Sequence, residues 1–79
     1  MKVYLAEIIF TTYEGNDVNK GTVTEQVRYR LITSCTQQTD AFDLVNNMVE
    51  RNKSDVTGKY EFEDGIKANK YSIRITVPW

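Results

Sequence analysis

The chain has 79 residues, of which 41% are hydrophobic and 27% charged, and its formal net charge is −1. This length predicts a single domain, residues 1–79, and this composition excludes an intrinsically disordered chain. The near-neutral charge excludes the basic surplus of a dedicated nucleic-acid binder and the acidic surplus of a DNA mimic, unless local patterning supplies one. No apolar run approaches the roughly 20 residues of a membrane-spanning helix, and the start of the chain is not typical of a secretory signal, so we expect no membrane partner.

The first predicted strand runs from Lys2 to about Tyr13 and is apolar on both faces. Successive side chains of a strand point to opposite faces. One face has no charge, and we expect the helix to cover its residues, which are Tyr4, Ala6, Ile8 and Phe10. The other face carries Val3, Leu5 and Ile9, with Glu7 between them.

This second apolar face needs a cover, because a chain with room for about one helix covers only one side of a sheet. Each such side chain left in water forgoes roughly 1.5–3 kcal/mol of burial free energy. We expect a second protein surface there, either another copy of the chain in a two-fold dimer or a target protein. The alternatives are that Arg and Lys stems lie over the face, or that the loop Glu14–Gly21 folds back onto it.

That loop, "EGNDVNKG", joins the first strand to a second one, Thr22–Thr33, in a predicted antiparallel hairpin. The second strand alternates cleanly between apolar and polar residues, which is typical of one face on a core and one in water. Its core face carries Val23, Val27, Tyr29 and Leu31, and its water face carries Thr24, Gln26, Arg28 and Arg30.

A helix is predicted from about residue 40 to residue 53. Thr39 or Asp40 is placed to cap its first turn. Arg51 and Lys53 fall in its last turn, and Gly58 lies just beyond its end. An apolar stripe at three- and four-residue spacing is predicted to face the sheet, and it consists of Ala41, Phe42, Leu44, Val45, Met48 and Val49.

Two strands close the chain, Lys59–Asp64 and Lys70–Val77, and the segment "GIKANK" between them is predicted to be a turn. Pro78 ends the last strand because proline cannot donate to a ladder. This strand places Tyr71, Ile73, Ile75 and Val77 inward, and Lys70, Ser72, Arg74 and Thr76 outward. The predicted fold is therefore α+β in the order ββαββ, a four-stranded, mainly antiparallel sheet with one helix packed on one face. The order of the strands in the sheet stays open.

The residues typical of catalysis are scarce, since the sequence contains no histidine and one cysteine, Cys35. This excludes Ser-His-Asp triads, histidine acid–base chemistry and the usual zinc sites. Cys35 is predicted to be a half-buried structural residue of a protein from a reducing, cytoplasmic compartment. The segment "EGNDVN" lacks the EF-hand spacing, the carboxylates Glu61 and Glu63 alternate with Lys59 as on a solvated face, and no phosphate-binding loop is present. We predict no catalytic, cofactor-binding or metal-binding residue and no enzymatic activity.

Cations gather on the outward faces of two predicted strands, Arg28 and Arg30 on the second and Lys70 and Arg74 on the last. If these strands lie near each other, the open sheet face is basic. It then either keeps the sheet soluble or docks an acidic protein or a phosphate backbone. An RNA-binding sheet needs stacking aromatic residues on that face. The aromatic residues 29, 60, 62 and 71 fall on the inward register, which ranks nucleic acid second.

Trp79 follows Pro78 at the end of the last strand. It is expected to fold over the helix–sheet edge, to lie in solvent, or to anchor a partner, since tryptophan is enriched at interface hot spots. The candidate partner-binding residues are Val3, Leu5, Ile9, Arg28, Arg30, Lys70, Arg74 and Trp79.

The layout of the chain resembles that of small proteins from phages and mobile elements. It has a strand, a glycine-containing loop, "GTVTEQVRYRL" opening the second strand, a Ser/Thr start to a short helix, and two closing strands. Such families include inhibitors that bind a host nuclease, polymerase or defence complex, anti-CRISPR proteins among them. The resemblance implies interaction rather than catalysis and supplies no functional residues. We therefore expect a small non-enzymatic protein-binding module, phage-encoded and cytoplasmic, that inhibits or modulates a larger host protein; the alternative is a nucleic-acid-binding accessory protein that uses the basic sheet face.

Overall fold

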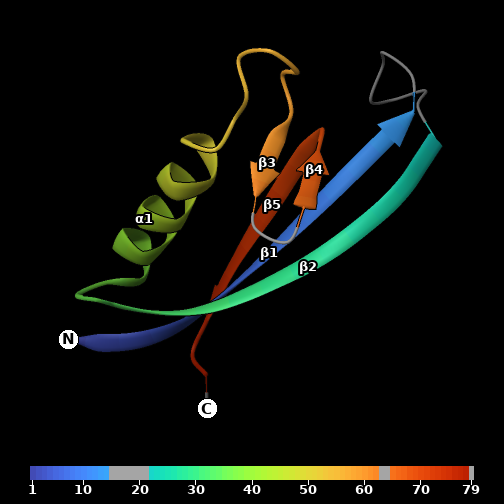
Figure 1. Ribbon diagram of the computed structural model, residues 1–79. Coiled ribbons are helices and arrows are strands. Elements are labelled where there is room, and N and C mark those ends of the chain that lie inside the picture. The colour runs from blue at the N-terminus through green and yellow to red at the C-terminus, as the bar shows by residue number, and fades with distance from the viewer. Residues whose placement is uncertain (15–21, 63–64, 79) are drawn as a thin grey trace.

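The computed structural model describes residues 1–14, 22–62 and 65–78 and has an α+β fold (Figure 1). In chain order the elements are β1 (Lys2–Glu14), β2 (Thr22–Cys35), α1 (Gln38–Glu50), β3 (Tyr60–Phe62), β4 (Ile66–Ala68) and β5 (Lys70–Thr76). The predicted loop after Glu14, the Glu63 carboxylate, the side chains of Val23 and Thr24, and Trp79 lie outside the described residues. The helix has 13 residues, and the described residues contain no helix that is long and apolar enough to cross a membrane.

The first strand, β1, is the centre of a three-stranded antiparallel sheet with the order β2-β1-β5. Its residue Ala6 lies opposite Leu31 of β2 on one side and opposite Ile75 of β5 on the other. Directly opposite residues share a face of a sheet, so the apolar residues of the three strands form one continuous layer. A shift of the register by one residue would turn this layer to the opposite face, which is why the alternation in the sequence specifies the pairing.

The predicted α+β class is confirmed, but the predicted order ββαββ with one four-stranded sheet is only partly so, because the described residues form a three-stranded and a two-stranded sheet. Strand β3 pairs with β4 in a separate two-stranded antiparallel sheet, with Tyr60 opposite Ala68 and Phe62 opposite Ile66. The segment predicted as a turn therefore contains a strand, and both Ile66 and Ala68 are buried. The β3–β4 pair does not extend the larger sheet, whose edge strands are β2 and β5.

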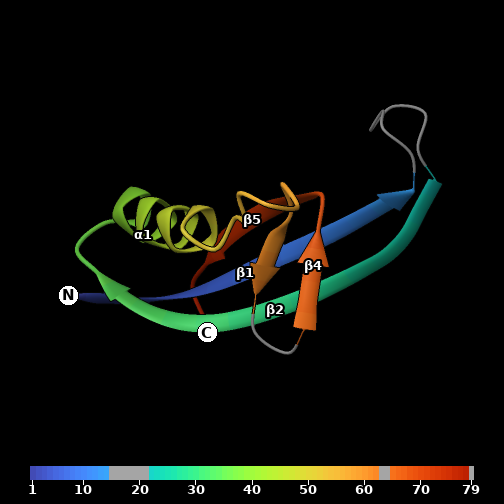
Figure 2. The same ribbon diagram turned by 45° about the horizontal axis from the view of Figure 1, so that its top comes forward.

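The helix and the β3–β4 pair cover the same face of the three-stranded sheet, one after the other along its length (Figures 1 and 2). The core between these layers is formed by Ala6, Ile8, Phe10, Val45, Val49, Ile66 and Ala68. The predicted inward face of β1 is confirmed, because the side chains at 4, 6, 8 and 10 are all buried. Val27, Tyr29 and Leu31 of β2 pack against the same core, as predicted, and Phe62 meets the Phe10 ring at 5.3 Å.

The ends of α1 differ from the prediction. The helix begins at Gln38, and the N-cap residue Gln37 makes no side-chain capping hydrogen bond, so the predicted cap at Thr39 or Asp40 is wrong. The Gln38 side chain instead donates to the Ile75 backbone oxygen at 2.8 Å, which ties the start of the helix to β5. The last turn contains no basic residue, because the helix ends at Glu50, before Arg51 and Lys53.

Candidate binding surface on the open sheet face

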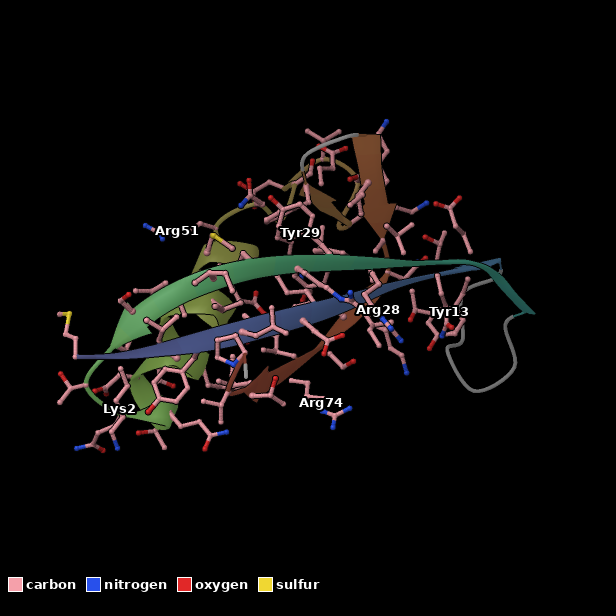
Figure 3. All side chains as sticks on the ribbon, turned by 90° about the horizontal axis from the view of Figure 1, so that it is seen from below. Lys2, Tyr13, Arg28, Tyr29, Arg51 and Arg74 are labelled. Carbon is pink, nitrogen blue, oxygen red and sulfur yellow. The ribbon has the colours of Figure 1, made fainter. Side chains whose placement is uncertain are left out.

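The side of the three-stranded sheet that faces away from α1 has no described helix or strand packed on it. We call it the open face. Its residues, placed by the strand register, are Val3, Leu5, Glu7 and Ile9 of β1, Arg28, Arg30 and Ile32 of β2, and Lys70, Ser72 and Arg74 of β5. In Figure 3, Arg28 and Arg74 come from the two outer strands, and α1 lies behind the sheet.

The structure brings together all the predicted partner-binding residues except Trp79, which lies outside the described residues. The two cationic strands, β2 and β5, lie near each other, as the predicted basic face requires, because they flank β1 on its two sides. Glu7 lies opposite Arg30 on one side and Arg74 on the other. The basic patch is therefore real, and it has a carboxylate at its centre.

The charges of the open face are unevenly exposed. The Glu7 carboxylate lies 3.4 Å from Nε of Arg30 and 3.7 Å from Nε of Arg28. The Glu7 side chain is only 17% exposed, whereas the side chains of Arg28 and Arg30 are 56% and 59% exposed. Among the residues that the register places on this face, Glu7 is the one carboxylate against the cations Arg28, Arg30, Lys70 and Arg74. The face presents guanidinium groups to solvent while its carboxylate stays enclosed, so its outward charge is positive.

One end of the open face is apolar. Val3 and Leu5 lie there beside Ile32, which is 59% exposed. A hollow of about 480 Å³ lies at this end of the sheet, along the edge of β1 beyond its last pair with β5, where Val3 borders it from the open face; it is lined by Met1, Lys2, Val3, Tyr4 and Val77. Val77 was predicted to point into the core, but it is 56% exposed, because β5 ends at Thr76. The apolar end thus has a hollow at its edge, about four residues along β1 from Glu7.

The opposite end of the open face carries an aromatic residue that the sequence analysis did not single out. The Lys70 ammonium group lies 5.5 Å from the centre of the Tyr13 ring. A shallower hollow of about 310 Å³, lined by Ile9, Gln26, Val27 and Arg28, lies between β1 and β2. The β1–β2 register shifts between Thr12 and Tyr13, so alternation alone does not place Tyr13, and its contact with Lys70 is what assigns it to this end.

A polar cluster on the other side of the sheet ties the helix to the strands. The Tyr71 hydroxyl lies 2.7 Å from both Oε1 of Glu50 and Oδ1 of Asn46, and its single proton is donated to one of them at a time. The Tyr60 hydroxyl donates to the same Glu50 oxygen at 3.4 Å. Burial, with the hydrogen bond to Glu50, raises the pKa of Tyr71 above its ordinary value. This cluster holds the end of α1 against β3 and β5.

The other candidates for chemistry are the cysteine and a metal site. Cys35 is buried at the end of β2, where its sulfur lies 3.9 Å from the Thr33 hydroxyl. It was predicted to be half-buried and is more enclosed than that. Within the ranges that the structure describes, no three His, Cys, Asp or Glu side chains are grouped closely enough to hold a metal ion.

Comparisons with protein-family models, with curated proteins and with solved structures found no match to this chain.

Proposed function

We propose that this chain is a small non-enzymatic module that binds a larger protein through the open face of its three-stranded sheet. The observation that supports this most is the meeting of two residue sets on one face. The apolar set comes from the second face of β1, and the cationic set comes from β2 and β5. Nothing in the packing of α1 or of the β3–β4 pair requires Leu5, Ile9 or Arg30 to lie there.

The composition of this face suits a protein partner. Protein interfaces combine a desolvated apolar centre with arginine and aromatic residues, and they are depleted in carboxylates and lysine at the centre. Covering Ile32 and the apolar residues of β1 would gain roughly 1.5–3 kcal/mol for each side chain that becomes fully buried. A module of this kind needs no reactive group of its own, because it acts by occupying the surface of another protein.

Inhibition is the form of this function that we propose. It rests on the resemblance of the layout to small phage and mobile-element proteins that bind host nucleases, polymerases or defence complexes. The cytoplasm is the compartment that suits it, since the buried thiol of Cys35 needs no oxidising environment. The host protein would then be the larger partner on the open face.

Affinity capture with matched variants tests the proposed function. Immobilised wild-type protein is incubated with a bacterial lysate beside Ile32→Lys and Leu5→Lys, and the captured proteins are quantified by mass spectrometry. Leu44→Lys is the control, because Leu44 is 48% exposed on the helix, away from the open face. We expect the open-face variants to lose a captured protein that the Leu44 variant keeps. Equal capture by all four proteins would rule out the open face as the binding site.

Nucleic acid is the second candidate, and the specific observation in its favour is the cationic row that ends at Tyr13 and Lys70. Phosphate contacts make binding fall steeply with salt concentration. If this candidate holds, Arg28→Ala combined with Arg30→Ala abolishes binding of a labelled oligonucleotide. The inner position of Tyr29, Phe62 and Tyr71 counts against it, because these rings pack in the core and are not available for base stacking. A lack of oligonucleotide binding at low salt eliminates it.

A further inference from the structure

We propose that the open face binds an acidic segment of its partner, with carboxylates at the arginines and an apolar side chain in the hollow beside Val3 and Val77. This inference rests on the proposed function and specifies the chemistry of the surface that the face recognises. It follows from three features of the face, which are its charge, the arrangement of its arginines, and the position of the apolar end.

The charge of the open face selects a partner of opposite sign. The protein as a whole has a net charge of −1, but Arg28, Arg30, Lys70 and Arg74 face one enclosed carboxylate on this surface. Two copies of the face brought together in a two-fold dimer would place cations against cations. Like charges across an interface disfavour association, while opposite charges speed it and fix its orientation. A second copy of the chain is therefore the less suitable occupant.

The arginines are arranged to receive carboxylates. Glu7 pairs with Nε of Arg28 and of Arg30, at 3.7 and 3.4 Å, so it orients two guanidinium groups whose side chains stay more than half exposed. Arg74 lies on the other side of Glu7 and has no ion pair among the described residues. Guanidinium groups held in this way can form paired hydrogen bonds with an incoming carboxylate, which a flexible ammonium group does less well.

The apolar end gives the partner a second feature. The hollow lined by Val3 and Val77 lies about four residues along β1 from Glu7. At a rise of roughly 3.3 Å per residue, this separates the apolar hollow from the arginines by about 13 Å. An extended segment with an apolar side chain four residues from a carboxylate spans that distance. A purely acidic polymer would fill only the arginine half of the site.

Labelled polymers test this recognition directly, with binding of the full chain followed by fluorescence anisotropy. The probes are a glutamate–tyrosine copolymer, poly-glutamate, a lysine–tyrosine copolymer and an oligo-deoxythymidine of matched length. We expect the glutamate–tyrosine copolymer to bind most tightly, poly-glutamate several-fold more weakly, and the lysine copolymer not at all. Repeated sites along each polymer raise the measured affinity, so that a weak single site is still detected.

Matched variants locate the binding. Arg30→Glu with Arg74→Glu is expected to weaken copolymer binding on the order of tenfold or more, because each exposed ion pair contributes up to about fivefold and reversal adds repulsion. Arg51→Glu with Lys67→Glu changes the net charge equally at exposed positions away from the open face, and should leave binding unchanged. Val77→Ser should weaken the copolymer but not poly-glutamate, which assigns the apolar contact to the hollow.

The outcomes that overturn the inference are distinct. The inference is contradicted if the acidic and basic copolymers bind equally, or if the Arg30 and Arg74 reversals have no effect. It is also contradicted if the oligonucleotide binds more tightly than the acidic copolymer. If lysate capture depends on Ile32 while copolymer binding is absent, the acidic segment is wrong and the proposed function stands. If capture also ignores Ile32, both are wrong.

Discussion

Ile8 and Ile9 are neighbours on the central strand, yet they lie in opposite environments. Ile8 is fully buried between Tyr29 of β2 and Ile73 of β5, beneath the helix and the β3–β4 pair. Ile9 lies on the open face between Arg28 and Ser72. On the inner side apolar residues meet apolar residues, and on the outer side they meet cations and hydroxyls. The same strand thus supplies a core surface on one side and the proposed binding surface on the other.

The largest expected effect comes from truncating the two isoleucines separately. Ile8→Ala should lower the free energy of unfolding by about 2–5 kcal/mol, because it opens a cavity in a fully packed core. Ile9→Ala should cost less than half as much, since its side chain is only partly covered in the monomer. Urea denaturation of both variants makes the comparison. Similar losses for the two variants would mean that the open face is already covered in the isolated protein.

A smaller effect is expected where the helix joins the inner face. Tyr71→Phe removes the hydroxyl that contacts Glu50 and Asn46 and should cost about 1 kcal/mol or slightly more, since one acceptor is charged. The ring itself stays against Phe10, so the core is not opened. Thermal denaturation of the variant checks this. An unchanged stability would mean that water replaces the hydroxyl without loss.

Alkaline pH probes the same hydroxyl. The pKa of Tyr71 is raised above its ordinary value of about 10, chiefly by burial and then by the Glu50 hydrogen bond, so the folded state favours the neutral form. This contribution to stability is complete below about pH 10 and is lost as pH rises through the folded-state pKa. Denaturant midpoints measured upward from pH 9 should therefore fall more steeply for the wild type than for Tyr71→Phe. Parallel curves would contradict the assignment.

The smallest stability effect is expected on the open face itself. Glu7→Gln removes the carboxylate between Arg28 and Arg30, and we expect the free energy of unfolding to change by less than about 1 kcal/mol, as is usual for pairs with exposed partners. The same variant should bind the glutamate–tyrosine copolymer more tightly, because the site loses its own negative charge while the amide oxygen can still accept from the arginines and orient them. Denaturation and anisotropy measurements on one preparation test both statements. A large loss of stability would identify Glu7 as part of the fold rather than of the recognition surface.

The sequence was sufficient to predict the long, strongly patterned elements. The alternation in β1, β2 and β5 and the three- and four-residue spacing in α1 each extend over enough residues to define a face. The open-face residues followed from the same alternation. This is why the alternation predicts Leu5, Arg30 and Arg74 on the same face of the sheet whatever the strand order.

The errors occur where the local signal is short. Ile66–Ala68 has three residues between Gly65 and Asn69, too few to show an alternation, and its flanking residues are typical of turns. It is a strand because Ile66 and Ala68 are buried in the core and because Asn69 N–H donates to the Thr11 oxygen. These contacts are distant in sequence. Strand order could not be predicted for the same reason, since the pairing of β1 with β5 leaves no trace in either segment alone.

The central position of β1 also governs how the chain reaches its native state. One of its two partners, β2, follows it directly in the chain. The other, β5, is far away in sequence, so that a pair such as Thr11 with Lys70 closes a loop that contains most of the chain. Closing so long a loop has an entropic cost that precedes any gain from pairing, and proteins rich in such contacts fold slowly, in roughly milliseconds to seconds. During synthesis the β1–β2 hairpin emerges first, with one edge of β1 unpaired and both apolar faces exposed. Until β5 emerges, we therefore expect the nascent chain to bind chaperones and to be open to edge-to-edge aggregation.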